Sequence, residues 1–120
     1  MPNLNAALLV AQLEQLDNFI ASKRELALEY DAFFESFENI DFIKEPKHSK
    51  SNYWLQSIIV KDLKERDTFL SYTNQHGVMS RPIWKLMNEL EMFKNSQCGD
   101  LNNSKYLEQR VINISSSVRT

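Results

Sequence analysis

The sequence predicts an α+β fold, with a small, mainly antiparallel sheet of about three strands and a long N-terminal helix and further helices packed on one face. Apolar residues recur at steps of three and four through the first third of the chain, and no glycine or proline lies between Asn3 and Glu45. Further on, short runs of β-branched and aromatic residues alternate with helical patterns. With 120 residues, of which 42% are apolar and 25% charged, we expect a single domain over 1–120.

The N-terminal helical pattern is too long for one helix in a domain of this size, because a helix over residues 3–37 would extend roughly 50 Å. We expect a break at Leu16-Asp17-Asn18, since Asp and Asn are poor in helix interiors and good at helix N-termini. Residues 6–11 are apolar on nearly every side, so the helix within 1–17 is expected to be buried all round. Residues 18–120 then open with an amphipathic helix that lies on the sheet.

Two extended segments and a polar loop follow. Ile40 and Phe42 alternate with polar neighbours and predict a short strand, and the run 53–60 predicts a central strand covered on both sides. Between them, residues 44–52 carry three lysines and one histidine. These cations could bind an anion, but a solvated loop is the favoured interpretation.

Capping residues delimit the next helix. Asp62, with Glu65 three residues later, predicts its start, and Gly77 predicts its C-terminal turn. His76 would then lie beside the negative helix end, which is a structural role. Residues 78–81 are expected to form a short strand that Pro82 ends.

The last third of the chain mixes loops with short elements. We expect one or two helical turns within 83–93 and a loop at 95–100. A helix over 104–110, capped by Asn102 or Asn103, and a final strand over 111–114 complete the chain.

Composition excludes several classes of protein. A net charge of −2 and a pI near 5.7 give no field that would attract nucleic acid. The single cysteine, Cys98, indicates a reducing compartment, and no apolar run approaches the roughly 20 residues that span a bilayer. The N-terminus lacks the features of a signal peptide, so we expect a cytoplasmic protein without a membrane partner.

Catalytic constellations are not visible in the sequence. The two histidines are far apart and the cysteine has no neighbour at ligand spacing, so we expect no metal site. One segment has an unusual chemical mix, because Arg81 and Trp84 flank the stiff Pro82. Arginine suits carboxylate or phosphate groups, and tryptophan stacks on flat rings. An ordinary surface ion pair and a core tryptophan are an equally weighted alternative.

Four motifs, in order along the chain, resemble the DegT-like nucleotide-sugar aminotransferases, which are pyridoxal-phosphate enzymes of fold type I. They are MPNLNAAL at 1–8 with AQLEQL at 11–16, NYWL at 52–55, GVMSRPIWKLM at 77–87, and LEQRVINI at 107–114. The resemblance covers essentially the whole chain. It implies the C-terminal small domain of such an enzyme, with 1–17 as the helix that joins the large domain.

The resemblance also implies which residues face a substrate and which are lacking. Arg81, Trp84 and Asn88 are expected to face the substrate, although Asn88 stands where relatives often have histidine and Leu9 where they have glycine. The family's catalytic lysine and its other cofactor-binding residues lie in the large domain. We therefore expect no catalytic residue in this chain and no cofactor bound by it alone.

Two hypotheses about function remain open. In the first, the chain is part of a pyridoxal-phosphate aminotransferase of the lipopolysaccharide or surface-sugar type, and it is inactive without the missing aminotransferase large domain. In the second, it is a stand-alone binding or assembly module. It would then form a homodimer through its apolar N-terminal helix, whose contact residues would be Leu4, Leu8, Leu9 and Leu13.

Overall fold

The structure, a computed structural model, describes residues 2–119 as an α+β domain, which confirms the predicted fold class. The helices and strands follow one another along the chain in the order that the sequence predicted. In order they are α1 (Asn3–Glu14), α2 (Leu16–Phe34), β1 (Ile40–Phe42), β2 (Gln56–Val60), α3 (Leu63–Gln75), β3 (Arg81–Pro82), the 3-10 turns η1 (Met87–Glu89) and η2 (Glu91–Phe93), α4 (Asn102–Glu108) and β4 (Val111–Ile114).

Antiparallel pairing joins the strands into one sheet with the order β1-β2-β4-β3. The sheet therefore has four strands, where the fold class was predicted with about three, and β2 lies inside it as predicted. The strand expected over 53–60 is shorter than predicted and begins at Gln56. Tyr53 cannot extend it, because its backbone is left-handed with φ 46°.

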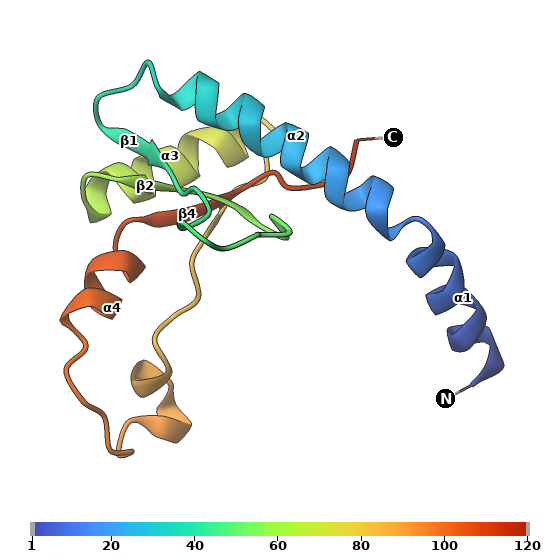
Figure 1. Ribbon diagram of the computed structural model, residues 1–120. Coiled ribbons are helices and arrows are strands. Elements are labelled where there is room, and N and C mark those ends of the chain that lie inside the picture. Colours follow the sequence, from blue (N-terminus) through green and yellow to red (C-terminus); the bar gives the residue numbers. More distant parts are fainter. Residues whose placement is uncertain (1, 120) are drawn as a thin grey trace.

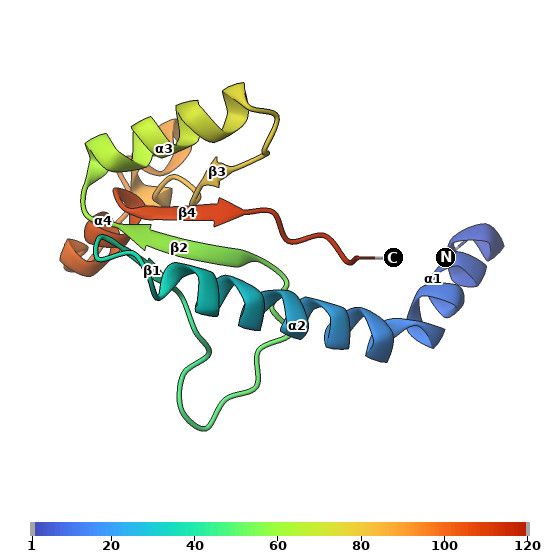
Figure 2. The same ribbon diagram turned by 90° about the horizontal axis from the view of Figure 1, so that it is seen from above.

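The core lies on one face of this sheet. In Figure 1 the sheet is seen nearly edge-on, with α2 and α3 above it and α4 and the two 3-10 turns below; Figure 2 shows the strand order from above. Side chains alternate between the two faces along each strand, and residues paired across neighbouring strands point to the same face. Phe42, Ile58 and Ile112, which are paired in this way, therefore share one face. That face contributes to the hydrophobic cluster of buried residues Ala27, Phe34, Phe42, Ile58, Val60 and Ile112, against which Phe69 and Leu70 of α3 also pack.

The strand after α3 differs from its prediction. It consists of Arg81 and Pro82, which pair with Asn113 and Ile112, so Pro82 is part of the strand and does not end it. Proline is tolerated here because β3 is an edge strand, where a residue can lack an N–H directed at a neighbour. Residues 78–80 form no strand.

The N-terminal helical region breaks at Gln15, one residue before the expected site, and Asn18 Nδ2 donates to Gln15 Oε1 at 3.0 Å. The expected burial of the first helix is wrong for this chain, since α1 has no buried residue. Figures 1 and 2 show the reason, because α1 projects away from the sheet and only the start of α2 adjoins it. Its four leucines are 80%, 61%, 48% and 56% exposed, at Leu4, Leu8, Leu9 and Leu13.

The predicted ends of α3 are confirmed. Asp62 Oδ1 accepts from the Glu65 backbone N–H at 2.9 Å, and Gly77 takes the left-handed conformation with φ 76°. His76 Nδ1 lies 2.8 Å from the Tyr72 carbonyl oxygen at the helix end. The caps predicted for α4 are wrong, because this helix begins at Asn102 itself with no side-chain cap.

Candidate functional site

A row of polar residues crosses the sheet face opposite the core. Arg81 pairs with Asn113, and Asn113 with Ser57, so the three side chains share one face on three neighbouring strands. Ser57 Oγ donates to Asn113 Oδ1 at 2.7 Å, which fixes the Asn113 amide. The Asn113 amide nitrogen has no hydrogen-bond acceptor among residues 2–119. The row therefore offers the Asn113 amide nitrogen and the Arg81 side chain as donors on the sheet face opposite the core.

Arg81 differs from the other arginines in what it binds. Arg24 and Arg119 each form an ion pair with a glutamate at 2.7 Å, Arg66 pairs with two acidic residues, and Arg110 donates to backbone carbonyls. The Arg81 guanidinium donates only to the thioether sulfur of Met79, at 3.7 Å, within the described chain. The alternative interpretation was a surface ion pair for Arg81 and a core position for Trp84. Neither holds in residues 2–119, since Arg81 has no ion pair and Trp84 is exposed.

Both tryptophans of the chain stack on each other beside the sheet. The ring centroids of Trp54 and Trp84 lie 6.2 Å apart with an interplanar angle of 27°. Trp54 precedes β2 and Trp84 follows β3, so the stack joins segments thirty residues apart in sequence. The two side chains are 64% and 65% exposed, which is unusual for such large apolar groups.

Trp54 is held by a network that starts on α2. Arg24 makes two hydrogen bonds to the Glu45 carboxylate, at 3.0 and 2.7 Å, and this carboxylate also accepts from the Ser51 N–H at 2.7 Å. These contacts lower the pKa of Glu45 to about 2, with the Arg24 hydrogen bond as the larger cause. The Tyr53 hydroxyl accepts from the Glu45 N–H, and Arg24 lies over the Tyr53 ring. The network thus fixes the residue before Trp54.

A second network fixes the residue before Arg81. Ser80 is buried, and the Asn74 amide donates to both its carbonyl oxygen, at 3.1 Å, and its hydroxyl, at 3.0 Å. Thr73 Oγ1 lies 2.5 Å from the same hydroxyl. Because β3 has only two residues, these contacts from the end of α3 supply much of what holds Arg81 in register.

The sequence-predicted residues are only partly brought together. Arg81 and Trp84 remain close along the chain, whereas Asn88 lies in η1, at the end of the segment that descends from β3 in Figure 1. Asn88 makes no hydrogen bond to Arg81 or Trp84 among the described residues. Sequence reasoning missed Ser57 and Asn113, because strand register is not visible in one sequence. Trp54 lay within a recognised motif but was not assigned a role.

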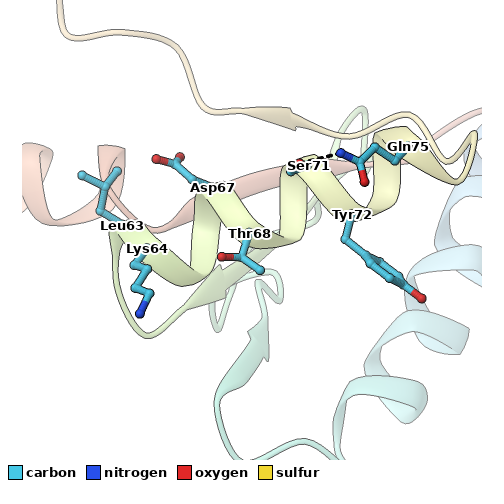
Figure 3. Close-up of a pocket in the computed structure, with 7 residues that line it drawn as sticks. All are labelled: Leu63, Lys64, Asp67, Thr68, Ser71, Tyr72 and Gln75. Carbon is cyan, nitrogen blue, oxygen red and sulfur yellow. Dashed lines mark hydrogen bonds between the residues drawn. The ribbon is translucent and has the colours of Figure 1, made fainter.

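The larger hollows on the surface do not form a catalytic pocket. One of about 820 Å³ lies along the outer side of α3, and Figure 3 shows that all of its lining side chains come from that one helix. A second, of about 620 Å³, lies between α3 and the turn before β1. Polar groups that project from one helix do not converge on a common point. Within residues 2–119, no cluster of His, Cys, Asp or Glu is suited to a metal ion.

The residues present do not fit pyridoxal phosphate. A lysine that forms a Schiff base is activated by desolvation or by a neighbouring cation. Eight of the nine lysines are exposed, and the ammonium of the half-buried Lys23 donates to the carbonyl oxygens of Trp54 and Ser116. Lys44 is paired with Asp31, which raises its pKa.

Solved structures with known names share this fold. A putative sugar aminotransferase from Streptococcus pneumoniae matches 98% of this chain with a TM-score of 0.85 and 20% identity, and the match covers 31% of that chain. The DesV structure from S. venezuelae, in complex with a ketimine intermediate, matches 95% with a TM-score of 0.85 and 16% identity, over 31% of its length. This chain therefore shares the fold of about a third of each of those two chains.

The family follows from the sequence. The DegT/DnrJ/EryC1/StrS aminotransferase family matches residues 1–120, and the chain belongs to this family. It is 32% identical over 93 residues to GDP-perosamine synthase of Escherichia coli O157:H7, and 33% identical over 97 residues to GDP-perosamine synthase of Vibrio cholerae. These matches cover 78% and 79% of this chain but only 25% and 26% of the relatives.

Members of the family use pyridoxal phosphate, as in the E. coli GDP-4-keto-6-deoxy-D-mannose-3-dehydratase, whose structure has hydrated PLP bound. In the part of the chain that the structure describes, no helix combines the length and hydropathy required to cross a bilayer.

Proposed function

We propose that this chain supplies the C-terminal small domain of a nucleotide-sugar aminotransferase and that it is not catalytic alone. Amino transfer requires, in addition, a large domain that carries the Schiff-base lysine. The observation that carries the proposal is the family match over residues 1–120, in a chain that spans about a quarter of the length of its curated relatives. The absence of a suitably placed lysine among the nine agrees with it.

The substrate we propose is a GDP-linked keto sugar, because the two curated relatives at 32% and 33% identity are GDP-perosamine synthases. The sheet face opposite the core would form one wall of the substrate site. Arg81 supplies a free guanidinium suited to phosphate or carboxylate oxygens, and Trp84 supplies an exposed aromatic surface. Asn88 lies further along the same segment and would approach the substrate only when a large domain closes on this face.

Coexpression tests this proposal. The chain is purified alone and together with the part of the V. cholerae enzyme that it does not match. We expect no yellow absorbance of lysine-bound pyridoxal phosphate and no amino transfer for the chain alone. In the complex we expect both to appear, and Arg81→Gln to reduce kcat/KM by about 10- to 100-fold, the effect of losing a charge-assisted hydrogen bond.

A matched control is Arg119→Gln, because Arg119 is paired with Glu29 and lies away from the sheet face. This variant should keep the activity of the parent complex. A purified chain that alone becomes yellow with pyridoxal phosphate, and retains it on one lysine after borohydride reduction, would contradict the proposal.

A second candidate function is a stand-alone module that forms a homodimer through α1. The observation in its favour is that α1 is apolar on nearly every side and buries no residue. Leu4, Leu8, Leu9 and Leu13 would form the contact. In light scattering, a dimer that Leu8→Asp converts to a monomer is expected, with Leu28→Asp, another exposed leucine, as control. A clean monomer at high micromolar concentration excludes this candidate.

A further inference from the structure

We propose that Trp54 and Trp84 together form the surface on which the base of a nucleoside diphosphate stacks, while Arg81 and Asn113 bind its phosphates. The inference rests on the proposed function, since it concerns the nucleotide portion of the same substrate. It adds two residues, Trp54 and Asn113, that the sequence motifs did not mark as substrate-facing.

The tryptophan pair has the properties of a stacking surface. Each ring contacts the other at 6.2 Å between centroids and is still about two-thirds exposed, at 64% and 65%. Two exposed indoles hold a large apolar area in water, which is unfavourable unless a partner covers it. A flat aromatic ring is the partner that fits a flat indole face, and base–aromatic stacking is tolerant of base identity.

The backbone of Tyr53, the residue before Trp54, has a strained conformation that the surrounding contacts must maintain. A left-handed backbone, such as that of Tyr53 with φ 46°, is unfavourable for a residue with a Cβ and persists only where the surroundings enforce it. Here the Tyr53 N–H donates to Ser51 Oγ at 2.9 Å and its hydroxyl accepts from Glu45. The Trp54 N–H donates to Asn52 Oδ1 at 3.0 Å, and its carbonyl accepts from Lys23. The backbone that carries the Trp54 indole is therefore fixed before a ligand arrives.

Trp84 is positioned by the end of β3. Pro82 fixes one backbone angle, and the Ile83 N–H donates to the Val111 carbonyl oxygen at 3.1 Å. The stretch of chain from Arg81 to Trp84 spans at most roughly 10 Å at 3.3 Å per residue. That reach is comparable to the separation between a nucleoside base and its terminal phosphate. A nucleoside diphosphate is therefore long enough to extend from the stack to the guanidinium.

The phosphate end of the ligand meets free donors. Arg81 has no oxygen acceptor within residues 2–119, and the Asn113 amide nitrogen points onto the same face with its oxygen already bonded to Ser57. Planar guanidinium groups bind phosphate oxygens through two parallel hydrogen bonds. An amide nitrogen beside it adds a neutral donor, so the pair suits a diphosphate better than a single carboxylate.

Intrinsic fluorescence tests the stack directly, because the chain has two tryptophans and both belong to it. We expect GDP to quench the emission of the purified chain with saturation. In calorimetry, Trp54→Ala should weaken GDP binding by about 5- to 100-fold, the effect of losing one stacked aromatic. Trp54→Phe should keep most of the affinity, which separates loss of stacking from loss of fold.

Two further variants test the phosphate end. Arg81→Gln should weaken GDP binding by about 10- to 100-fold, and Arg119→Gln should leave it within about twofold. Inorganic pyrophosphate should compete with GDP without quenching the tryptophans. Unchanged emission at millimolar GDP, or equal affinity of Trp54→Ala and the parent, overturns the inference.

The two proposals can fail separately. If the chain binds GDP as described but the complex with a large domain transfers no amino group, the proposed function is wrong and the nucleotide surface stands. If the complex is active and Trp54→Ala leaves its KM for the GDP-linked sugar unchanged, the function stands and the nucleotide surface is wrong.

Discussion

Replacement of Ile58 by alanine tests whether the core on the helix-covered face makes this chain a stable domain by itself. Ile58 is fully buried, at 0% exposure, and pairs directly with the equally buried Ile112 between the two inner strands. The change removes three carbon atoms, each worth about 0.8 kcal/mol when buried, and leaves a cavity that the sheet cannot close. We expect the free energy of unfolding to fall by about 3–4 kcal/mol.

This loss is large for a chain of 120 residues, since small domains are stable by only about 5–15 kcal/mol. Urea unfolding followed by circular dichroism measures it as a lower midpoint with an unchanged slope. Ile43→Ala is the matched control, because Ile43 is 41% exposed just beyond β1 and should cost less than about 1 kcal/mol.

Two results would refute the reasoning. A chain without a cooperative unfolding transition has no independent core, and the domain would then depend on a partner for its stability. Equal losses for Ile58→Ala and Ile43→Ala would show that the burial described here does not determine stability. Either result would also remove the structural basis for measuring ligand binding on the chain alone.

Two other predictions concern local contacts. The pKa of Glu45 is lowered to about 2, so the stability that its ionised form contributes is present above about pH 4.5 and lost as the pH falls through about 2. The difference in unfolding free energy between the parent and Glu45→Gln should therefore shrink over that range in urea titrations; a constant difference would refute it. Asp62→Ala should cost about 1 kcal/mol and Asp62→Asn much less, because asparagine also caps the Glu65 N–H. Equal midpoints for the two variants would show that the cap contributes nothing.

Local signals in the sequence predicted most of the fold. The cap at Asp62, the glycine turn at Gly77 and the final strand over 111–114 are confirmed, because each depends on residues a few positions apart. The break in the first helix was misplaced by one residue. Burial of α1 was predicted wrongly, since apolar composition shows that a helix needs a partner but not that the partner is present.

The candidate site could be predicted only in part, because its residues meet through long-range pairing. The sequence marked Arg81 and Trp84 as close neighbours, and the structure keeps them so. It could not show that Trp84 stacks on Trp54, or that Asn113 lies beside Arg81. Those contacts follow from the strand order, and one sequence does not fix the pairing of strands separated by helices.

The register that builds the core also builds the polar row. Along β2 and β4, the pair Ile58 and Ile112 faces the helices, and the next pair, Ser57 and Asn113, faces the other way. A slip of one residue would expose the isoleucines and bury the polar pair, which is strongly unfavourable. The apolar core therefore fixes the outer face without any help from a ligand. The position of Arg81 is not fixed by the core in this way, because β3 has only two residues and is too short to set its own register. The hydrogen bond from the Asn74 amide at the end of α3 to the Ser80 carbonyl oxygen helps to hold it.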